Sequence, residues 1–136
     1  RQLENALSIV KPGGVVVLVA ECQEGYGSRG FHEWLKRYRD FRALERAIRR
    51  EWEFGAEEAF LLRRGLQSVR VILVSALPDL YAVETYGLRT APTASSAVDL
   101  ALRIVGRRGR FAAIPYASVI HPRRVPSTET EASASA

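Results

Sequence analysis

The sequence has 136 residues, 47% of them hydrophobic and 26% charged, a composition typical of one folded domain. Twenty Lys and Arg outweigh fifteen Asp and Glu, so the formal net charge is +5. One Cys and two His exclude a disulfide framework and a self-contained zinc site. The longest apolar run, 15–20, is far shorter than the roughly 20 residues that cross a bilayer. We therefore expect a cytoplasmic protein with no membrane partner.

In chain order, apolar residues at helical spacing predict helices over 2–10, 31–38, 41–52, 57–66, 80–86 and 95–105. Continuous apolar runs predict strands over 15–20, 69–75 and 111–114. The first strand shows no alternation, so we expect it in the centre of the sheet, covered on both faces. Ser95 or Ser96 is expected to cap the last helix.

Strands separated by helices predict an α/β fold, a three-layer α/β/α sandwich with a mostly parallel central sheet, Rossmann-like in character. We expect this domain to occupy residues 1–124. The low-complexity residues 125–136 predict a disordered tail. Because the sequence begins at Arg1 and contains no Met, we expect it to be a fragment of a larger protein.

A glycine-rich loop follows the first predicted strand. Residues 25–30 match the G-x-G-x-x-G pattern of dinucleotide sites, but the tight turn and the later acidic residue of that fingerprint are missing. Open α/β sheets bind ligands at the carboxyl ends of their strands. We therefore expect the loop to line a cleft through Glu21, Cys22, Gly25, Gly27 and Ser28. A Rossmann-like nucleotide-binding domain using 25–30 remains an alternative function.

Arginine clusters raise the question of nucleic-acid binding. They occur at 42–50, 63–64, 107–110 and 123–124. Glutamates interleave with the first cluster, and the others are scattered along the sequence. We interpret them as a solvated, salt-laced surface, and an Arg-rich nucleic-acid-binding module is the further alternative.

Several segments occur together, in order, in one known family. They are LENAL (3–7), VKPGG (10–14), AECQEGYG (20–27), FHEWL (31–35), VILVS (71–75), the Gly-Leu pair at 87–88 and IPYAS (114–118). In this order they resemble the carboxy-terminal domain of LarA-type nickel-dependent lactate racemases. The resemblance covers about 3–122, nearly the whole predicted domain.

The resemblance implies part of a racemase or epimerase that acts on a small 2-hydroxy acid. In that family a nickel-pincer nucleotide takes a hydride from the carbon bearing the hydroxyl and returns it to either face. The catalytic His pair and the residues that hold the cofactor belong to the amino-terminal domain. We therefore expect no catalytic residue and no nickel ligand here, a partner domain on the same or another chain, and no activity in isolation.

The resemblance also assigns two positions to the substrate side. By spacing, Arg1 corresponds to a Lys that contacts the substrate carboxylate, so Arg1 is the expected substrate-binding residue. Within 52–60, relatives carry a His-Lys pair or a Trp near the cofactor, where this sequence has Glu57 and Glu58. We expect Glu57 to line the cleft. Carboxylates at this place disfavour an anion such as lactate.

Overall fold

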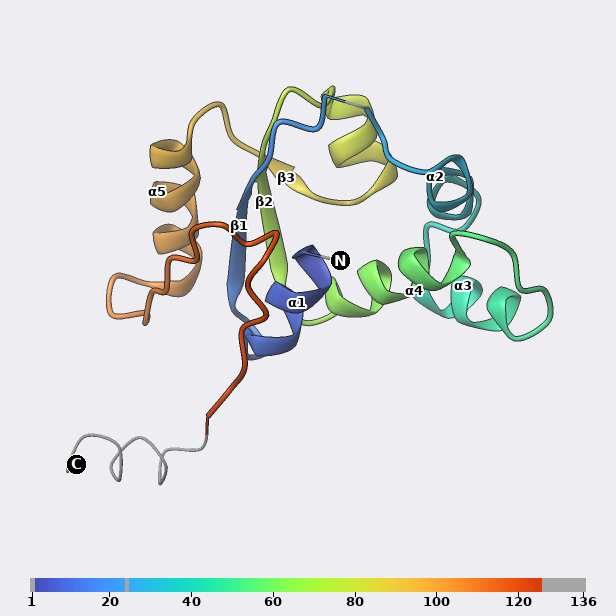
Figure 1. Cartoon of the computed structure of the whole chain (residues 1–136), viewed down its shortest axis with the longest axis horizontal. Helices are drawn as coiled ribbons and strands as arrows, with labels where there is room; N and C mark the ends of the chain where they lie inside the picture. The colour runs from blue at the N-terminus through green and yellow to red at the C-terminus, as the bar shows by residue number, and fades with distance from the viewer. Residues whose placement is uncertain (1, 24, 126–136) are drawn as a thin grey trace.

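The computed structural model describes residues 2–23 and 25–125 (Figure 1). Its helices are α1 (Gln2–Ile9), α2 (Arg29–Arg37), α3 (Phe41–Ile48), α4 (Ala56–Gly65), a π-helix η1 (Leu80–Thr85) and α5 (Ala94–Val105). Its strands are β1 (Val15–Val19), β2 (Arg70–Val74) and β3 (Arg89–Thr90). None of the described helices is long and apolar enough to cross a membrane. Of the tail predicted over 125–136, residues 126–136 lie outside the described residues.

The strands form a parallel sheet in the order β1-β2-β3, with helices on both faces (Figure 1). Helix α5 packs against β1 and β2 on one face. On the other face α1 contacts β1 and α4, and α2 and α3 pack on α4. The predicted α/β fold, with its three layers and parallel sheet, is confirmed.

Alternation along β2 divides the core between the two faces. Val71 and Leu73 belong to the larger cluster, which also holds Leu35 and Leu44 from α2 and α3. Ile72 belongs to a smaller cluster under α5. All four of the largest fully buried side chains come from these layers, so the sheet positions the helices on either side.

Two sequence predictions about the sheet are wrong. In the described residues β1 pairs with β2 alone, so it is an edge strand rather than a central one. Its sequence is continuously apolar, like that of a central strand, because helices cover both of its faces. Residues 111–114 form no strand: Phe111 is 67% exposed, and Pro115 lacks the backbone donor that would extend a ladder. The third strand is instead the short β3.

Helix ends also differ from the prediction. Thr93, not Ser95 or Ser96, is the N-cap of α5: its hydroxyl accepts from the Ser96 amide at 3.1 Å, and the Ser96 hydroxyl accepts from the Thr93 amide at 3.1 Å. This reciprocal pair is a capping box, which satisfies amides at the first turn of the helix. Helix α3 ends at Ile48, earlier than the predicted 52, and a loop leads to α4.

Candidate functional site

A groove of about 250 Å³ lies where three helices begin. It is lined by Leu3, Glu4 and Leu7 of α1, by Ser28 and Phe31 at the start of α2, and by Glu58 and Leu62 of α4. The lining therefore combines apolar side chains with two carboxylates and one hydroxyl. Such a surface can hold a small organic molecule and orient it by a few polar contacts.

The groove exists because α2 and α4 begin in backbone contact. A Cβ on Gly30 would overlap the carbonyl oxygen of Phe54, and a Cβ on Gly55 would overlap the backbone of Gly30 and Phe31. Gly55 also has φ +90°, which favours glycine. Ser28 then caps α2, its hydroxyl accepting from the Phe31 amide at 3.3 Å. These contacts place Ser28 and Phe31 beside the first turns of α4.

The start of α4 carries Glu57 and Glu58, both exposed. Their carboxylates lie in the first turn, where the helix dipole favours negative charge. Glu58 lines the groove and Glu57 is its neighbour in sequence. This edge of the groove is therefore anionic.

The predicted site residues divide between two places. Ser28 lines the groove, whereas Glu57 does not and its sequence neighbour Glu58 does. Glu21, Cys22, Gly25 and Gly27 lie in the loop between β1 and α2, at the carboxyl end of the sheet, and do not contribute to the groove lining. Arg1 lies outside the described residues, directly before the helix whose Leu3 and Glu4 line the groove.

The loop between β1 and α2 is fixed to its neighbours. The Glu21 carbonyl accepts from the Ser75 hydroxyl at 3.2 Å and from the Ala76 amide at 3.4 Å. The Tyr26 carbonyl accepts from the Tyr86 hydroxyl at 2.6 Å. Cys22 has φ +53°, a left-handed conformation that is uncommon for a residue other than glycine. The loop is thus tied to the segment that follows β2.

The conformation of the loop explains two of the three glycines in the pattern, Gly25 and Gly27. Both have positive φ, +80° and +81°, and a Cβ on either would meet no atom within 4 Å. They serve the turn itself. The third glycine of the pattern, Gly30, is required by the contact with α4. Each glycine of the G-x-G-x-x-G pattern thus has a role in the backbone of this domain.

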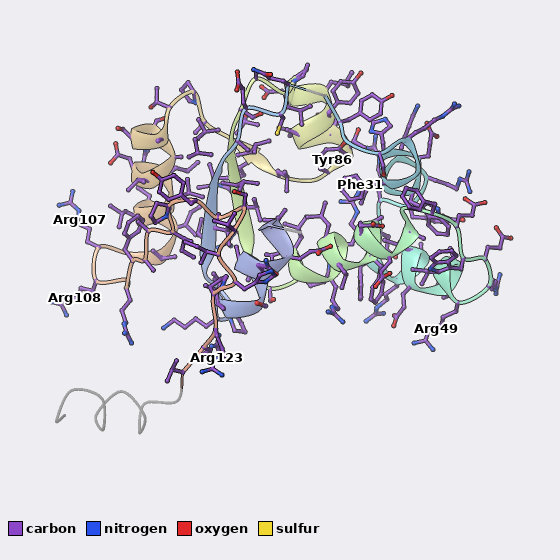
Figure 2. All side chains as sticks on the ribbon, viewed as in Figure 1. Phe31, Arg49, Tyr86, Arg107, Arg108 and Arg123 are labelled. Carbon is purple, nitrogen blue, oxygen red and sulfur yellow. The ribbon has the colours of Figure 1, made fainter. Side chains whose placement is uncertain are left out.

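An aromatic cluster joins the loop to α2 and η1. The ring of His32 lies 4.4 Å from that of Tyr26, 5.4 Å from that of Tyr81 and 6.1 Å from that of Tyr86. The rings of Phe31 and Tyr86 are tilted by 53° to each other, with centroids 5.4 Å apart (Figure 2). Burial, and then the nearby Tyr26, Cys22 and Tyr81, raise the pKa of Tyr86 above its ordinary value. The Tyr86 phenol is therefore a neutral hydrogen-bond donor.

Sequence reasoning missed Arg63, whose side chain is only 8% exposed. Its guanidinium donates to the carbonyls of Leu35 at 3.2 Å, Thr85 at 2.8 Å and Tyr86 at 3.2 Å. Burial, with Arg39 adding to it, lowers its pKa. The available signal was helical spacing, because Ala59 four residues earlier lies on the buried stripe of α4. Arg63 joins α4 to α2 and to the end of η1.

The described residues do not fit a nickel centre. No three His, Cys, Asp or Glu side chains gather in them as metal ligands would. The imidazole of His32 is packed among tyrosine rings, and its Nδ1 is buried with no hydrogen-bond partner. We therefore derive no chemical step through nickel from this chain.

Comparisons with known proteins agree on one relationship. The family model described as "Lactate racemase C-terminal domain" matches residues 1–120. The chain is 28% identical over 114 residues to the lactate racemase of Thermoanaerobacterium thermosaccharolyticum, which covers 77% of this chain and 26% of that protein. The structure of the lactate racemase apoprotein from the same organism is similar, with a TM-score of 0.68 at 27% identity, over 78% of this chain and 26% of that one. The chain thus spans about a quarter of the length of this relative.

Proposed function

This chain belongs to the family of lactate racemase C-terminal domains, and on that premise we propose that its groove forms one wall of a cleft in which a small 2-hydroxy acid is racemised or epimerised. The other wall is the amino-terminal domain, on the same or another chain. The isolated C-terminal domain has no activity of its own.

One observation supports this assignment more than any other. The start of α1 and the start of α4 lie far apart in sequence, yet Leu3, Glu4 and Glu58 line the same groove. The resemblance assigns these same two segments to the substrate side, through Arg1 and through the Glu57–Glu58 pair. The two segments that the resemblance marks thus contribute Leu3, Glu4 and Glu58 to one groove.

The roles of the two domains are those that the family resemblance implies. The amino-terminal domain would hold the nickel-pincer nucleotide, which would supply the hydride chemistry, and would contribute the acid and the base. This domain contributes the apolar floor formed by Leu7, Phe31 and Leu62, which excludes water from one side of the cleft.

The carboxylate of Glu58 affects which acid is accepted. At a separation of about 8 Å, two negative charges repel by roughly 1–2 kcal/mol for an effective dielectric constant of about 20–40. We propose that this repulsion weakens the binding of lactate, whose only other polar group is one hydroxyl. Removing the charge relieves it.

The test uses a chimera in which this chain replaces the C-terminal domain of the Thermoanaerobacterium enzyme. Racemisation of lactate and of other 2-hydroxy acids is followed by chiral chromatography, with the cofactor-loaded chimera and with the chain alone. We expect activity in the chimera and none in the chain alone. Glu58→Gln should raise kcat/KM for lactate by about fivefold or more, as removal of a repulsion of ~1 kcal/mol predicts.

Glu33→Gln is the matched control, because Glu33 is exposed on α2 and does not line the groove. It removes the same charge and should leave kcat/KM unchanged. A chimera that folds and binds cofactor but racemises none of the acids would contradict the proposed function. An equal effect of both substitutions would contradict the role of Glu58.

A further inference from the structure

Basic residues that are scattered in the sequence meet at one edge of the sheet. The turn at 10–14 lies beside the turn before β2, because the Gly13 amide donates to the Ser68 carbonyl at 2.7 Å. The segment that follows α5 lies beside them, since the Arg124 guanidinium donates to the Ile9 carbonyl at 2.9 Å. Helix α5 ends on this side too (Figure 1). The amino-terminal edge of the sheet therefore gathers three separate segments.

We call this surface the basic edge. It consists of seven exposed cations: Lys11, Arg70, Arg107, Arg108, Arg110, Arg123 and Arg124. The connecting segments that carry it, 9–14, 65–70 and 106–125, contain no Asp or Glu. Within the described part of the chain, none of the seven forms an ion pair. In Figure 2, Arg107 and Arg108 point outward at the left and Arg123 lies at the lower edge, all away from Phe31 and Tyr86.

The opposite edge has the opposite charge. The loop at 20–28, which follows β1, and the segment at 75–84, which follows β2 and includes most of η1, contain acidic residues and no Lys or Arg. The charges are thus separated along the strand direction, which concentrates a positive potential at the basic edge. Folding of the domain does not require this separation of charge. The positive potential would, however, attract a partner that carries many negative charges.

Two exposed aromatic side chains belong to the segment that carries five of the seven cations. Phe111 is 67% exposed and Tyr116 is 81% exposed, and both belong to the 106–125 segment. Nucleic-acid bases stack on such rings, and the guanidinium fork binds phosphate oxygens in pairs. Six of the seven cations are Arg. We propose that the basic edge binds single-stranded nucleic acid, with Arg side chains on the phosphates and Phe111 and Tyr116 under the bases.

The arginines of α3 and its C-cap lie among carboxylates in the sequence and provide a control. Arg49 forms an ion pair with Glu45 at 3.1 Å, and Glu51 follows the helix closely. No carboxylate interrupts the basic edge in this way. Cations already balanced by carboxylates release fewer counterions when they meet phosphate.

The experiment measures the fluorescence anisotropy of a labelled oligothymidylate of roughly 15 nucleotides with the full chain over a range of salt concentrations. For about five to seven phosphate contacts, log K should fall with log salt at a slope near −3 to −5. The triple variant R107Q/R108Q/R123Q should lose at least about tenfold in affinity, and its slope should be shallower by about 2. The double variant F111A/Y116A should lose about tenfold for the single strand and little for a duplex.

The matched control R42Q/R46Q/R49Q removes the same charge from α3 and its C-cap, including the ion-paired Arg49, and should lose less than about twofold. Circular dichroism melts check that every variant is folded. Three results would overturn the proposal: no binding at low salt, an equal loss in the control, or equal affinity for polyglutamate of the same charge. The last would indicate an acidic protein partner. None of them affects the groove, so failure here and failure of the proposed function are distinguishable.

Discussion

Gly30 and Gly55 lie backbone against backbone at the point where α2 and α4 begin. The space that a side chain on Gly30 would need is filled by the Phe54 carbonyl, and the space at Gly55 is filled by the start of α2. The contact fixes two of the three helix starts that form the groove. The close approach of α2 and α4 therefore requires glycine at positions 30 and 55.

Replacing either glycine should separate the helices. Gly30→Ala and Gly55→Ala each insert a methyl group into backbone that has no room to move, so we expect a loss of about 3 kcal/mol or more in the free energy of unfolding. Gly55→Ala adds the strain of a left-handed residue. Urea denaturation followed by circular dichroism measures both variants.

Gly25→Ala separates the strain of a positive φ from the steric overlap between helices. Gly25 has φ +80° but open space around the position of a Cβ, so only backbone strain applies. We expect a loss of about 1 kcal/mol. If Gly30→Ala unfolds at the same urea concentration as the wild type, the close contact between α2 and α4 is wrong.

Arg63 should be required for stability although it is a charged residue. Arg63→Met leaves the carbonyls of Leu35, Thr85 and Tyr86 without their donor, and a loss of about 2–4 kcal/mol is expected. Arg63→Lys should recover only part of it, because one ammonium cannot span three acceptors on two elements. The exposed Arg64→Gln is the control. Similar unfolding midpoints for the Met variant and the control would refute this role.

Alkaline pH should unfold the protein through Tyr86. Its pKa is raised in the folded state, so both states are neutral below the ordinary tyrosine value of about 10. Above that pH the unfolded chain ionises first and the folded state loses stability. Tyr86→Phe should flatten this decline and cost about 1 kcal/mol at neutral pH, through loss of the bond to Tyr26.

The measurement is the urea midpoint of both proteins from pH 8 to above 11, a range chosen around the ordinary tyrosine pKa of about 10. Tyr116→Phe, at an exposed position, controls for the loss of a phenol and should leave the profile of the wild type unchanged. A decline of the same slope in Tyr86→Phe and in the wild type would show that another group is responsible.

The capping box of α5 makes a smaller contribution. Thr93→Ala removes the oxygen that accepts from the Ser96 amide, and we expect a loss of about 1 kcal/mol. Ser95→Ala, in the same exposed turn, should change stability by less than about 0.5 kcal/mol. Thermal melts of the two variants compare them directly, and equal melting temperatures would argue against the cap.

The long elements could be predicted from the sequence because their patterns are strong. The run at 15–20 exceeds β1 by one residue at its end, and the run at 69–75 exceeds β2 by one residue at each end. The position of β1 could not be predicted, because helices cover both faces of an edge strand and of a central strand alike. β3 has two residues, too few for any period, whereas 111–114 is apolar without being buried.

The candidate site was predicted only in part. Ser28 was identified through its place in the glycine-rich loop, and the family resemblance marked the Glu57–Glu58 pair, of which Glu58 lines the groove. The groove itself depends on helix starts that meet through Gly30 and Gly55, and no local pattern records a contact between distant segments. Arg63 resembled one more surface cation, since burial of a charge depends on carbonyls supplied by other elements.

The most direct test of the central claim is hydrogen–deuterium exchange of the chimera compared with the isolated chain. If the groove faces the amino-terminal domain, amides of α1, the start of α2 around Phe31 and the start of α4 around Glu58 should exchange more slowly in the chimera. The basic edge should exchange equally in both proteins. Protection confined to the loop at 20–27 and to η1, with the groove unchanged, would contradict the claim.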